Sequence, residues 1–193
     1  YSYGARMFDE KGCVVLDSPE AIESYRFFTD LKNVDGVLPP DVTAWDYPEL
    51  LVALQEGVVA QAAFFTAGMP ILADCEQTPD LCENLAFVRQ PAGPAGSWTR
   101  INPLGIMVNS GSPRVEATVA FLGWLTGPDG GKLYTQFGGT SPRVSVLDEA
   151  LRAERPWIDQ VYAAAENGAG SLRIGRASEV SAIFNKWADQ VMA

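Results

Sequence analysis

The sequence predicts an α/β protein that is rich in helices and carries a short mixed sheet. Apolar side chains such as Tyr25, Phe28 and Leu31 recur at helical spacing in several segments. Short apolar runs, for example residues 58–65, lie between those segments and have the length of strands. Because predicted strands are separated by predicted helices along the chain, we expect layers of helix packed on sheet.

The first helix is expected to begin at Ser18 and Pro19. Serine is a preferred N-cap, proline is favoured at the first helical position, and Glu20 adds an acidic group to the first turn. The helix is expected to stop near residues 33–36. Before it, the apolar run around Cys13 predicts a short strand in which this cysteine is buried.

A second helix is indicated by the pattern Asp46-x-x-Glu49, which resembles a capping box. The run VVAQAAFF at residues 58–65 then predicts a strand that is buried on both faces. Two further short strands are expected, at residues 84–91 and 105–109.

The remainder of the chain is predicted to be mostly helical. Ser112 and Pro113 repeat the helix start of the first segment, and Pro128 opens another helix. Two short helices are expected, at residues 146–154 and 156–167. A final helix over residues 177–192 has the most regular apolar spacing, which is formed by Val180, Ile183, Phe184, Trp187 and Val191.

The composition excludes several classes of protein. Of the 193 residues 47% are hydrophobic and 20% are charged, which is typical of a globular chain. The net charge of −10 argues against a nucleic-acid partner, because binding phosphates needs a basic surface. No apolar run reaches the length of about 18 residues that a membrane span requires. The opening text, which starts at Tyr1 without a methionine, reads as the interior of a longer precursor.

The three cysteines favour a disulfide over a metal site. Cys75 and Cys82 flank a short polar turn that a disulfide can close, as expected in an oxidising compartment, and the alternative is two buried thiols. The sequence has no histidine and no second cysteine pair, so no metal ligand set is predicted.

No catalytic residues or cofactor motifs are predicted. Without histidine the commonest general base is missing, and the chain has no nucleophile elbow, P-loop or dinucleotide-binding glycine pattern. A hydrolase that uses a carboxylate such as Asp46 or Asp148 is kept as the least favoured alternative.

Aromatic and polar residues gather where the predicted elements end, which is typical of a ligand pocket. The positions that share this property are Trp45, Phe64, Phe65, Thr66, Asn102, Leu104, Gly105 and Arg143. Each has a structural alternative, since a lone aromatic residue is commonly part of the core and Arg143 would equally suit a solvent-facing loop. A second alternative is an interaction module whose aromatic surface binds a protein.

The order of motifs resembles that of the extracellular solute-binding proteins of ABC transporters, in the carbohydrate-binding group to which maltose-binding protein belongs. The matching text includes GARMFDEKGCVVLDSPEAIESYRFFTDL, LQEGVVAQAAFF and residues 89–147. The resemblance implies a type II periplasmic-binding-protein-like fold of two α/β lobes, of which this chain is the C-terminal portion only. It assigns residues 1–90 to the first part of the C-terminal lobe, 91–141 to the hinge and a segment that crosses to the N-terminal lobe, and 142–193 to helices of the C-terminal lobe.

The resemblance also implies a function without catalysis. Arg143 would donate paired hydrogen bonds to the vicinal hydroxyls of a sugar or polyol, on a loop that Pro142 stiffens by restricting the residue before it. Phe64, Phe65 and Trp45 would stack on a sugar ring, while Asn102, Leu104 and Gly105 would add amide and backbone contacts. The implied partners are a carbohydrate and the permease subunits, and the implied location is periplasmic, extracellular or lipid-anchored, reached through a signal peptide in the precursor. Because the first lobe's main sheet would be missing, we expect exposed apolar surface on residues 104–126 and self-association of this piece.

Overall fold

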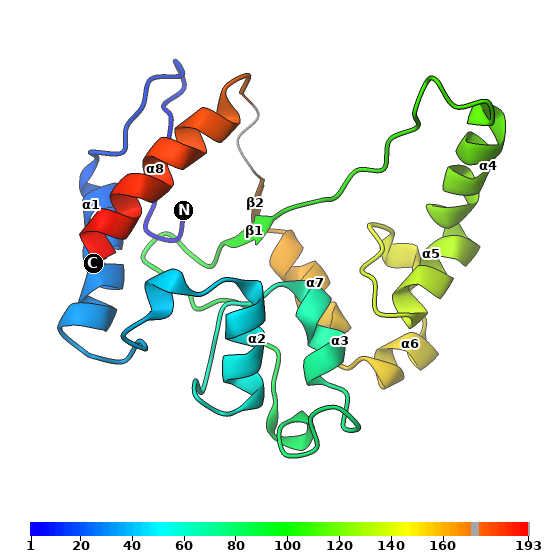
Figure 1. Ribbon diagram of the computed structural model, residues 1–193, viewed down its shortest axis with the longest axis horizontal. Helices are drawn as coiled ribbons and strands as arrows, with labels where there is room; N and C mark the ends of the chain where they lie inside the picture. Colours follow the sequence, from blue (N-terminus) through cyan, green and yellow to red (C-terminus); the bar gives the residue numbers. More distant parts are fainter. Residues whose placement is uncertain (171–173, 193) are drawn as a thin grey trace. The chain divides into compact units, whose positions relative to one another are not determined.

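The computed structural model describes residues 1–170 and 174–192, and these residues form two compact units. Each unit combines segments that are far apart in the sequence, so the chain passes between the units several times (Figure 1). Unit 1 contains Tyr1–Val52, Gln90–Ile101 and the described residues from Asn167 onward, and unit 2 contains Ala53–Arg89 and Asn102–Glu166.

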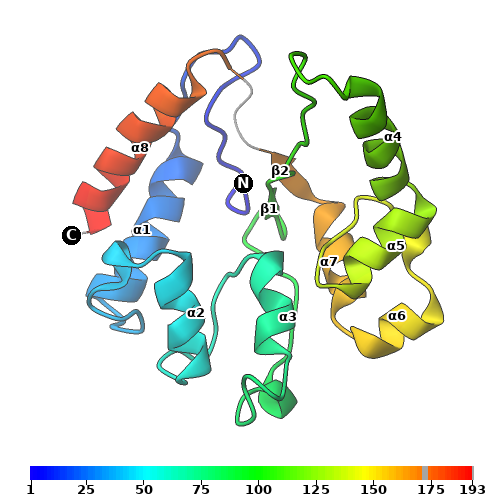
Figure 2. The same ribbon diagram turned by 45° about the vertical axis from the view of Figure 1, so that its right-hand side comes forward.

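Unit 1 is built around two long helices, α1 (Pro19–Asn33) and α8 (Ala177–Met192). The two helices lie side by side in both views (Figures 1 and 2). The rings of Tyr25 and Phe184 lie 6.0 Å apart between them, and Lys32 Nζ donates a hydrogen bond of 2.7 Å to the Met192 carbonyl. The apolar spacing that predicted α8 therefore faces α1 over part of its length.

The start of α1 confirms the prediction made from its capping residues. Ser18 Oγ accepts a hydrogen bond from the Ala21 amide at 3.3 Å, and Pro19 is the first helical residue. The start of α2 (Tyr47–Gln55) has half of the expected capping box, because the Asp46 amide donates to Glu49 Oε2 at 3.0 Å. Local hydrogen-bonding signals thus place both helix starts correctly.

The sheet is short and parallel. Strand β1 (Thr99–Ile101) pairs with β2 (Gly168–Gly170), with Thr99 opposite Gly168 and Ile101 opposite Gly170. The predicted strands at 58–65, 84–91 and 105–109 are wrong, since these residues form no ladder in the described structure. The run at 13–16 makes only an isolated bridge between Phe8 and Val14, and Cys13 is exposed rather than buried. A strand needs a neighbouring edge that supplies hydrogen bonds, and an apolar run does not encode that edge.

Unit 2 has its core where its later helices meet. The helices and 3₁₀ turns of this unit are η2 (Thr66–Gly68), α3 (Met69–Leu72), η3 (Cys82–Asn84), α4 (Val115–Leu125), α5 (Pro128–Gln136), η4 (Val144–Val146), α6 (Glu149–Glu154) and α7 (Ile158–Ala165). The core consists of Val146, Leu147, Leu151, Trp157 and Ile158. Met69 of α3 and Phe87 pack against it, which connects the earlier segment of the unit to η4, α6 and α7.

Helix α4 leaves most of its large apolar side chains exposed. The helix begins at Val115, two residues after the predicted start at Pro113, and none of its residues is buried. Leu104 and Met107, on the segment that leads to it, are each 91% exposed. The expectation of exposed apolar surface on residues 104–126 is therefore confirmed. Among the described residues no helix is both long enough and apolar enough to cross a membrane.

Candidate functional site

The loop that carries Arg143 connects α5 to η4 in unit 2. The chain leaves α5 at Gln136 and turns at Gly138, whose φ of 99° lies in the region that favours glycine. Ser141 follows and is only 2% exposed. The Arg143 amide donates to Ser141 Oγ at 3.2 Å, so the residue before Pro142 fixes the backbone direction at the arginine.

Two side chains from later helices hold this loop. Tyr162 Oη on α7 donates a hydrogen bond of 2.5 Å to the Ser141 carbonyl. Arg155 Nη2, directly after α6, donates a hydrogen bond of 2.8 Å to the Gln136 carbonyl. The loop is consequently attached at the end of α5 and again two residues before Arg143.

The guanidinium of Arg143 is itself held on one side. Arg143 Nε donates to the Thr126 carbonyl, at the C-terminal end of α4, at 3.2 Å. This carbonyl lies where the helix dipole places partial negative charge, which favours a cation. Within the part of the chain that the structure describes, neither Nη1 nor Nη2 of Arg143 makes a hydrogen bond, and the residue is exposed. The two terminal nitrogens of Arg143 are therefore not used by any protein acceptor among the described residues.

The segment that carries Phe64 and Phe65 leads into α3, and α3 meets the arginine loop at Pro70. The ring of Phe64 lies against Gly68, because a Cβ added to that glycine would lie 2.0 Å from Phe64 Cε1. The same short segment continues into α3, where Pro70 meets the loop: a Cβ on Gly138 would lie 3.4 Å from Pro70 Cγ. Phe65 is exposed and Thr66 begins η2. Pro70, five residues after Phe65, is therefore the point at which this segment meets the arginine loop.

Leu104 and Gly105 lie on an exposed segment that leads to α4. No hydrogen bond among the described residues connects Leu104 or Gly105 to Arg143, and a Cβ on Gly105 would have open space within 4 Å. Asn102 lies on the same exposed segment. Trp45 belongs to unit 1, whereas all the other predicted residues belong to unit 2. The contribution of all eight predicted residues to a ligand site stays a prediction.

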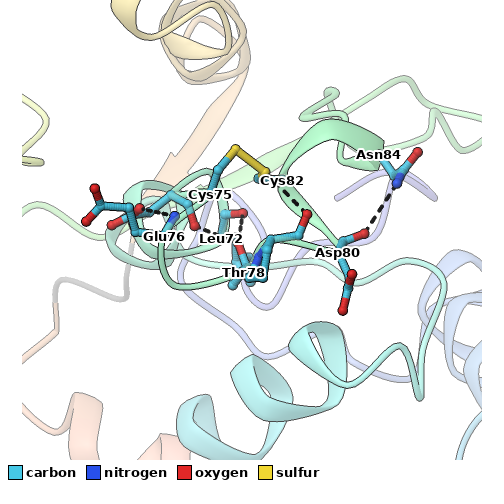
Figure 3. Close-up of a disulfide and its surroundings, with 9 residues drawn as sticks. Leu72, Cys75, Glu76, Thr78, Asp80, Cys82 and Asn84 are labelled. Atoms are coloured by element: carbon cyan, nitrogen blue, oxygen red, sulfur yellow. Dashed lines mark hydrogen bonds between the residues drawn. A yellow bond between two sulfur atoms is a disulfide. The ribbon is translucent and has the colours of Figure 1, made fainter.

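A disulfide closes the turn that follows α3. Cys75 and Cys82 are bonded, with their Cα atoms 5.2 Å apart (Figure 3). Inside the closed turn, the buried Thr78 Oγ1 donates to the Leu72 carbonyl at 2.9 Å and lies 3.0 Å from the Asp74 carbonyl. The turn therefore satisfies a carbonyl at the end of α3, the helix whose Pro70 contacts Gly138.

The carboxylates considered for hydrolysis have structural roles instead. Asp148 Oδ1 caps α6 by accepting from the Leu151 amide at 2.9 Å, and its other oxygen pairs with Lys132. The hydrogen bond from Lys132, and then that from Leu151, lower the pKa of Asp148. Asp46 caps the start of α2. Among the described residues no cluster of acidic or cysteine side chains could hold a metal ion.

Arg155 and Tyr162 were not predicted as site residues. Both lie in the segment that the sequence indicated only as two short helices. A signal was present, because the helical spacing of Ile158 and Tyr162 turns the tyrosine inward, and a buried hydroxyl needs an acceptor. What the pattern does not contain is the identity of that acceptor, a backbone carbonyl 21 residues earlier.

A family model described as bacterial extracellular solute-binding protein matches residues 1–132, which is more than half of the chain. The chain belongs to this family. Members of the bacterial extracellular solute-binding protein family bind solutes for ABC transporters and are not enzymes, so the hydrolase alternative is wrong. The resemblance seen in the motif order is confirmed.

The relatives of this solute-binding protein include one curated sequence and two solved structures. A probable amino-acid ABC transporter periplasmic-binding protein, y4oP of Sinorhizobium fredii, is 25% identical over 149 residues, covering 77% of this chain and 32% of y4oP. The structure of maltose-bound MalE3 of T. maritima has a TM-score of 0.85 at 23% identity, covering 99% of this chain and 50% of MalE3. A putative oligosaccharide periplasmic-binding protein of Synechococcus sp. MITs9220 has a TM-score of 0.66 at 15% identity, covering 99% of this chain and 51% of that protein.

These likenesses establish the fold class of the solute-binding protein as periplasmic-binding-protein-like. The chain spans about half the length of the two solved relatives and about a third of the curated one. The described sheet is parallel and two-stranded, in a fold that is otherwise helical.

Proposed function

We propose that this chain is part of the solute-binding component of an ABC importer and that its solute is a sugar, an oligosaccharide or a polyol. The observation that supports the proposal is the approach of Pro70 to Gly138, because it joins the segment that carries Phe64 and Phe65 to the loop that carries Arg143. A ring face next to a forked donor is the combination that carbohydrates need, since a sugar offers an apolar face and adjacent hydroxyls.

Arg143 supplies the directional part of this site. Its Nε is occupied by the Thr126 carbonyl, so the guanidinium plane is oriented before the ligand arrives. Nη1 and Nη2 then donate to two vicinal hydroxyl oxygens, a geometry that lysine does not reproduce. Phe65, which is exposed, covers the apolar face of the ring, with Phe64 supporting it from the side of Gly68.

The proposal also assigns the chain segments to lobes and gives the remaining predicted residues contacts with the solute. Residues 1–90 form the first part of the C-terminal lobe, 91–141 the hinge and crossing segment, and 142–193 the returning helices. Trp45, Asn102, Leu104 and Gly105 contact the solute from the other walls of an interlobe cleft. No bond is made or broken: the solute has higher affinity for the closed state, and permease subunits recognise that state. The component works in the periplasm or outside the cell, either free or lipid-anchored.

Calorimetric titration of the full-length protein tests this function. The panel contains maltose, trehalose and sorbitol, and each sugar is also titrated into Arg143→Lys and Arg143→Ala. We expect binding of at least one panel member, a loss of about tenfold to a hundredfold with Arg143→Ala, and little recovery with lysine, since a bidentate donor contributes about 1.5–3 kcal/mol. Wild-type affinity for no carbohydrate, together with tight binding of a different solute class, would exclude the proposal.

An amino acid is the second candidate solute, because the relative y4oP is described as a probable amino-acid binder. Arg143 suits this class as well, since a guanidinium pairs with a carboxylate through two parallel hydrogen bonds. The two candidates differ in their response to salt. Raising the ionic strength from 0.05 to 1 M would weaken an ion pair at the exposed Arg143, whereas hydrogen bonds to neutral hydroxyls would change little.

A further inference from the structure

Two side chains outside the predicted ligand contacts hold the loop of Arg143 at both of its ends. We infer that Tyr162 and Arg155 are positioning residues, which keep this loop in the one conformation that presents the guanidinium to the solute. The inference deepens the proposed function and rests on it for the role of Arg143. The contacts that carry it are the hydrogen bonds from Tyr162 to the Ser141 carbonyl and from Arg155 to the Gln136 carbonyl.

The first attachment satisfies the end of a helix. Gln136 is the last residue of α5, so its carbonyl has no partner within the helix. Arg155 Nη2 supplies that partner at 2.8 Å, and a charged donor makes this bond stronger than a neutral one. Because Gly138 leaves the helix two residues later with a positive φ, the position of the α5 end determines where the loop begins.

Arg155 is unusually buried for an arginine whose side chain makes one hydrogen bond among the described residues. It is 8% exposed, and its Nε and Nη1 have no hydrogen-bond partner among the described residues. Its guanidinium carbon lies 5.8 Å from the centroid of the Trp157 ring, which recovers part of the cost of burial. Burying a cation with unsatisfied donors is destabilising, so overall stability does not explain this residue. The burial of Arg155 is explained if its role is to fix the end of α5 and the loop that follows.

The second attachment lies two residues before Arg143. Ser141 cannot shift easily, because it is buried against α5, where a Cβ on Gly131 would lie 3.0 Å from Ser141 Oγ. Tyr162 donates a hydrogen bond to the carbonyl of Ser141, and the Arg143 amide donates one to the side-chain oxygen of Ser141. The peptide that starts at Ser141 is therefore defined at both its carbonyl and its side chain, which leaves Arg143 a narrow range of directions.

The consequence for binding is entropic. A loop that is ordered before the solute arrives does not lose conformational freedom on binding, whereas a loosened loop must be ordered at that step. Removing one anchor should therefore lower affinity even though neither anchor touches the solute. The effect should also disappear when Arg143 is absent, because the anchors act only through it.

Hydrogen exchange of the amides of residues 137–143 in the ligand-free, full-length protein tests the inference directly. Tyr162→Phe removes one hydroxyl and keeps the ring, and Arg155→Lys keeps the charge while removing the planar donor. We expect exchange about fivefold faster in either variant, in line with the loss of one hydrogen bond worth about 1 kcal/mol. Tyr25→Phe, which alters a partly buried tyrosine of unit 1, is the matched control and should leave this loop unchanged.

Maltose affinity supplies the second readout. Tyr162→Phe should weaken maltose binding about fivefold in the wild-type background and not at all in Arg143→Ala. Unchanged exchange in residues 137–143 in both variants would overturn the positioning role, whatever the affinities. Faster exchange with no maltose binding by any protein, including the wild type, would instead count against maltose as the solute and leave the anchors confirmed. If Tyr162→Phe fails to fold, hydrogen exchange and maltose affinity of Arg155→Lys provide the same two tests.

Discussion

The phenolic oxygen of Tyr162 lies 2.5 Å from the carbonyl oxygen of Ser141, across 21 residues of sequence. The contact requires the protonated phenol, because a phenolate has no proton to donate. Burial raises the pKa of Tyr162 above its ordinary value, so the donor is retained at neutral and mildly alkaline pH.

This contact predicts a defined alkaline dependence. Since the folded pKa of Tyr162 is higher than the unfolded one, its contribution to stability is complete below about pH 10 and is lost as the pH rises through the folded pKa. Urea unfolding midpoints measured from pH 8 to 11.5 should fall in the wild type and fall less in Tyr162→Phe. Burial also raises the pKa of Tyr25, so Tyr25 should add to the fall in stability at alkaline pH. Measuring Tyr25→Phe over the same pH range gives the size of that second contribution. Equal slopes in wild type and Tyr162→Phe would contradict the assignment.

Gly138→Ala should destabilise unit 2 at the point where the arginine loop meets α3. The φ of 99° disfavours any residue with a Cβ, and the new methyl would lie 3.4 Å from Pro70 Cγ. We expect the free energy of unfolding to fall by about 1–2 kcal/mol. Gly105→Ala, where nothing lies within 4 Å, should change it by less than about 0.5 kcal/mol. Chemical denaturation of both variants compares the two positions, and an equal effect would show that the turn imposes no requirement.

Asp148 should make the fold sensitive to acid. The hydrogen bonds from Lys132 and Leu151 hold the pKa of Asp148 below its ordinary value, so its contribution is present above about pH 4 and is lost as the pH falls through the folded pKa. Asp148→Asn keeps a side-chain acceptor for the Leu151 amide and loses the charge, whereas Asp148→Ala loses both. At pH 7 the order of stability should be wild type, then asparagine, then alanine. Equal denaturation midpoints for asparagine and alanine would exclude the capping role.

The disulfide should contribute measurably to stability. A disulfide between cysteines seven residues apart lowers the entropy of the unfolded chain. In the chain-entropy description this stabilises the folded state by about 2.5 kcal/mol. The double variant Cys75→Ser with Cys82→Ser should lose an amount of this order in urea unfolding. Cys13→Ser is the control, because Cys13 is an exposed free thiol. Thiol titration of the native protein should find one reactive group before reduction and three afterwards, and three at the outset would contradict the bond.

Helix α4 should drive self-association of this chain. The rings of Phe121 and Trp124, which are both exposed, lie 5.8 Å apart on its surface. Apolar surface of this kind favours association in water. Sedimentation velocity should detect oligomers at micromolar concentration, and Phe121→Glu should shift the chain toward the monomer. Glu116→Lys, an equally exposed change on the same helix, should leave the distribution as it is. A monomeric wild type at 0.1 mM would contradict the prediction.

The helices could be predicted from sequence because their signals are local. Ser18 lies three residues from the amide that it caps, and Pro128 opens α5 where the sequence placed it. The strands could not, because pairing depends on segments that lie far apart. Thr99 pairs with Gly168, and a glycine-rich strand such as β2 has no apolar pattern to reveal it. Conversely, residues 58–65 have the pattern, yet they form no strand ladder in the described structure, and Val58 is 63% exposed.

In the candidate site, too, the local features could be predicted from sequence and the long-range contacts could not. The rigid mounting of Arg143 could be anticipated from Pro142, since a proline restricts the residue before it. The three contacts that complete the mounting come from Thr126, Arg155 and Tyr162, and none is closer than 12 residues to its partner. Sequence spacing carries no information on such pairs, so only the fold could identify them.

The positions of Arg155 and Tyr162 in the sequence also determine when the arginine loop can be fixed during translation. Arg155 and Tyr162 follow the carbonyls that they hold by 19 and 21 residues. At about 5–20 residues per second, a ribosome exposes Ser141 roughly one to four seconds before the tyrosine that fixes it. A nascent chain halted in that interval already contains Arg143 and the Thr126 carbonyl that binds its Nε, and yet the tyrosine that holds the Ser141 carbonyl is still missing.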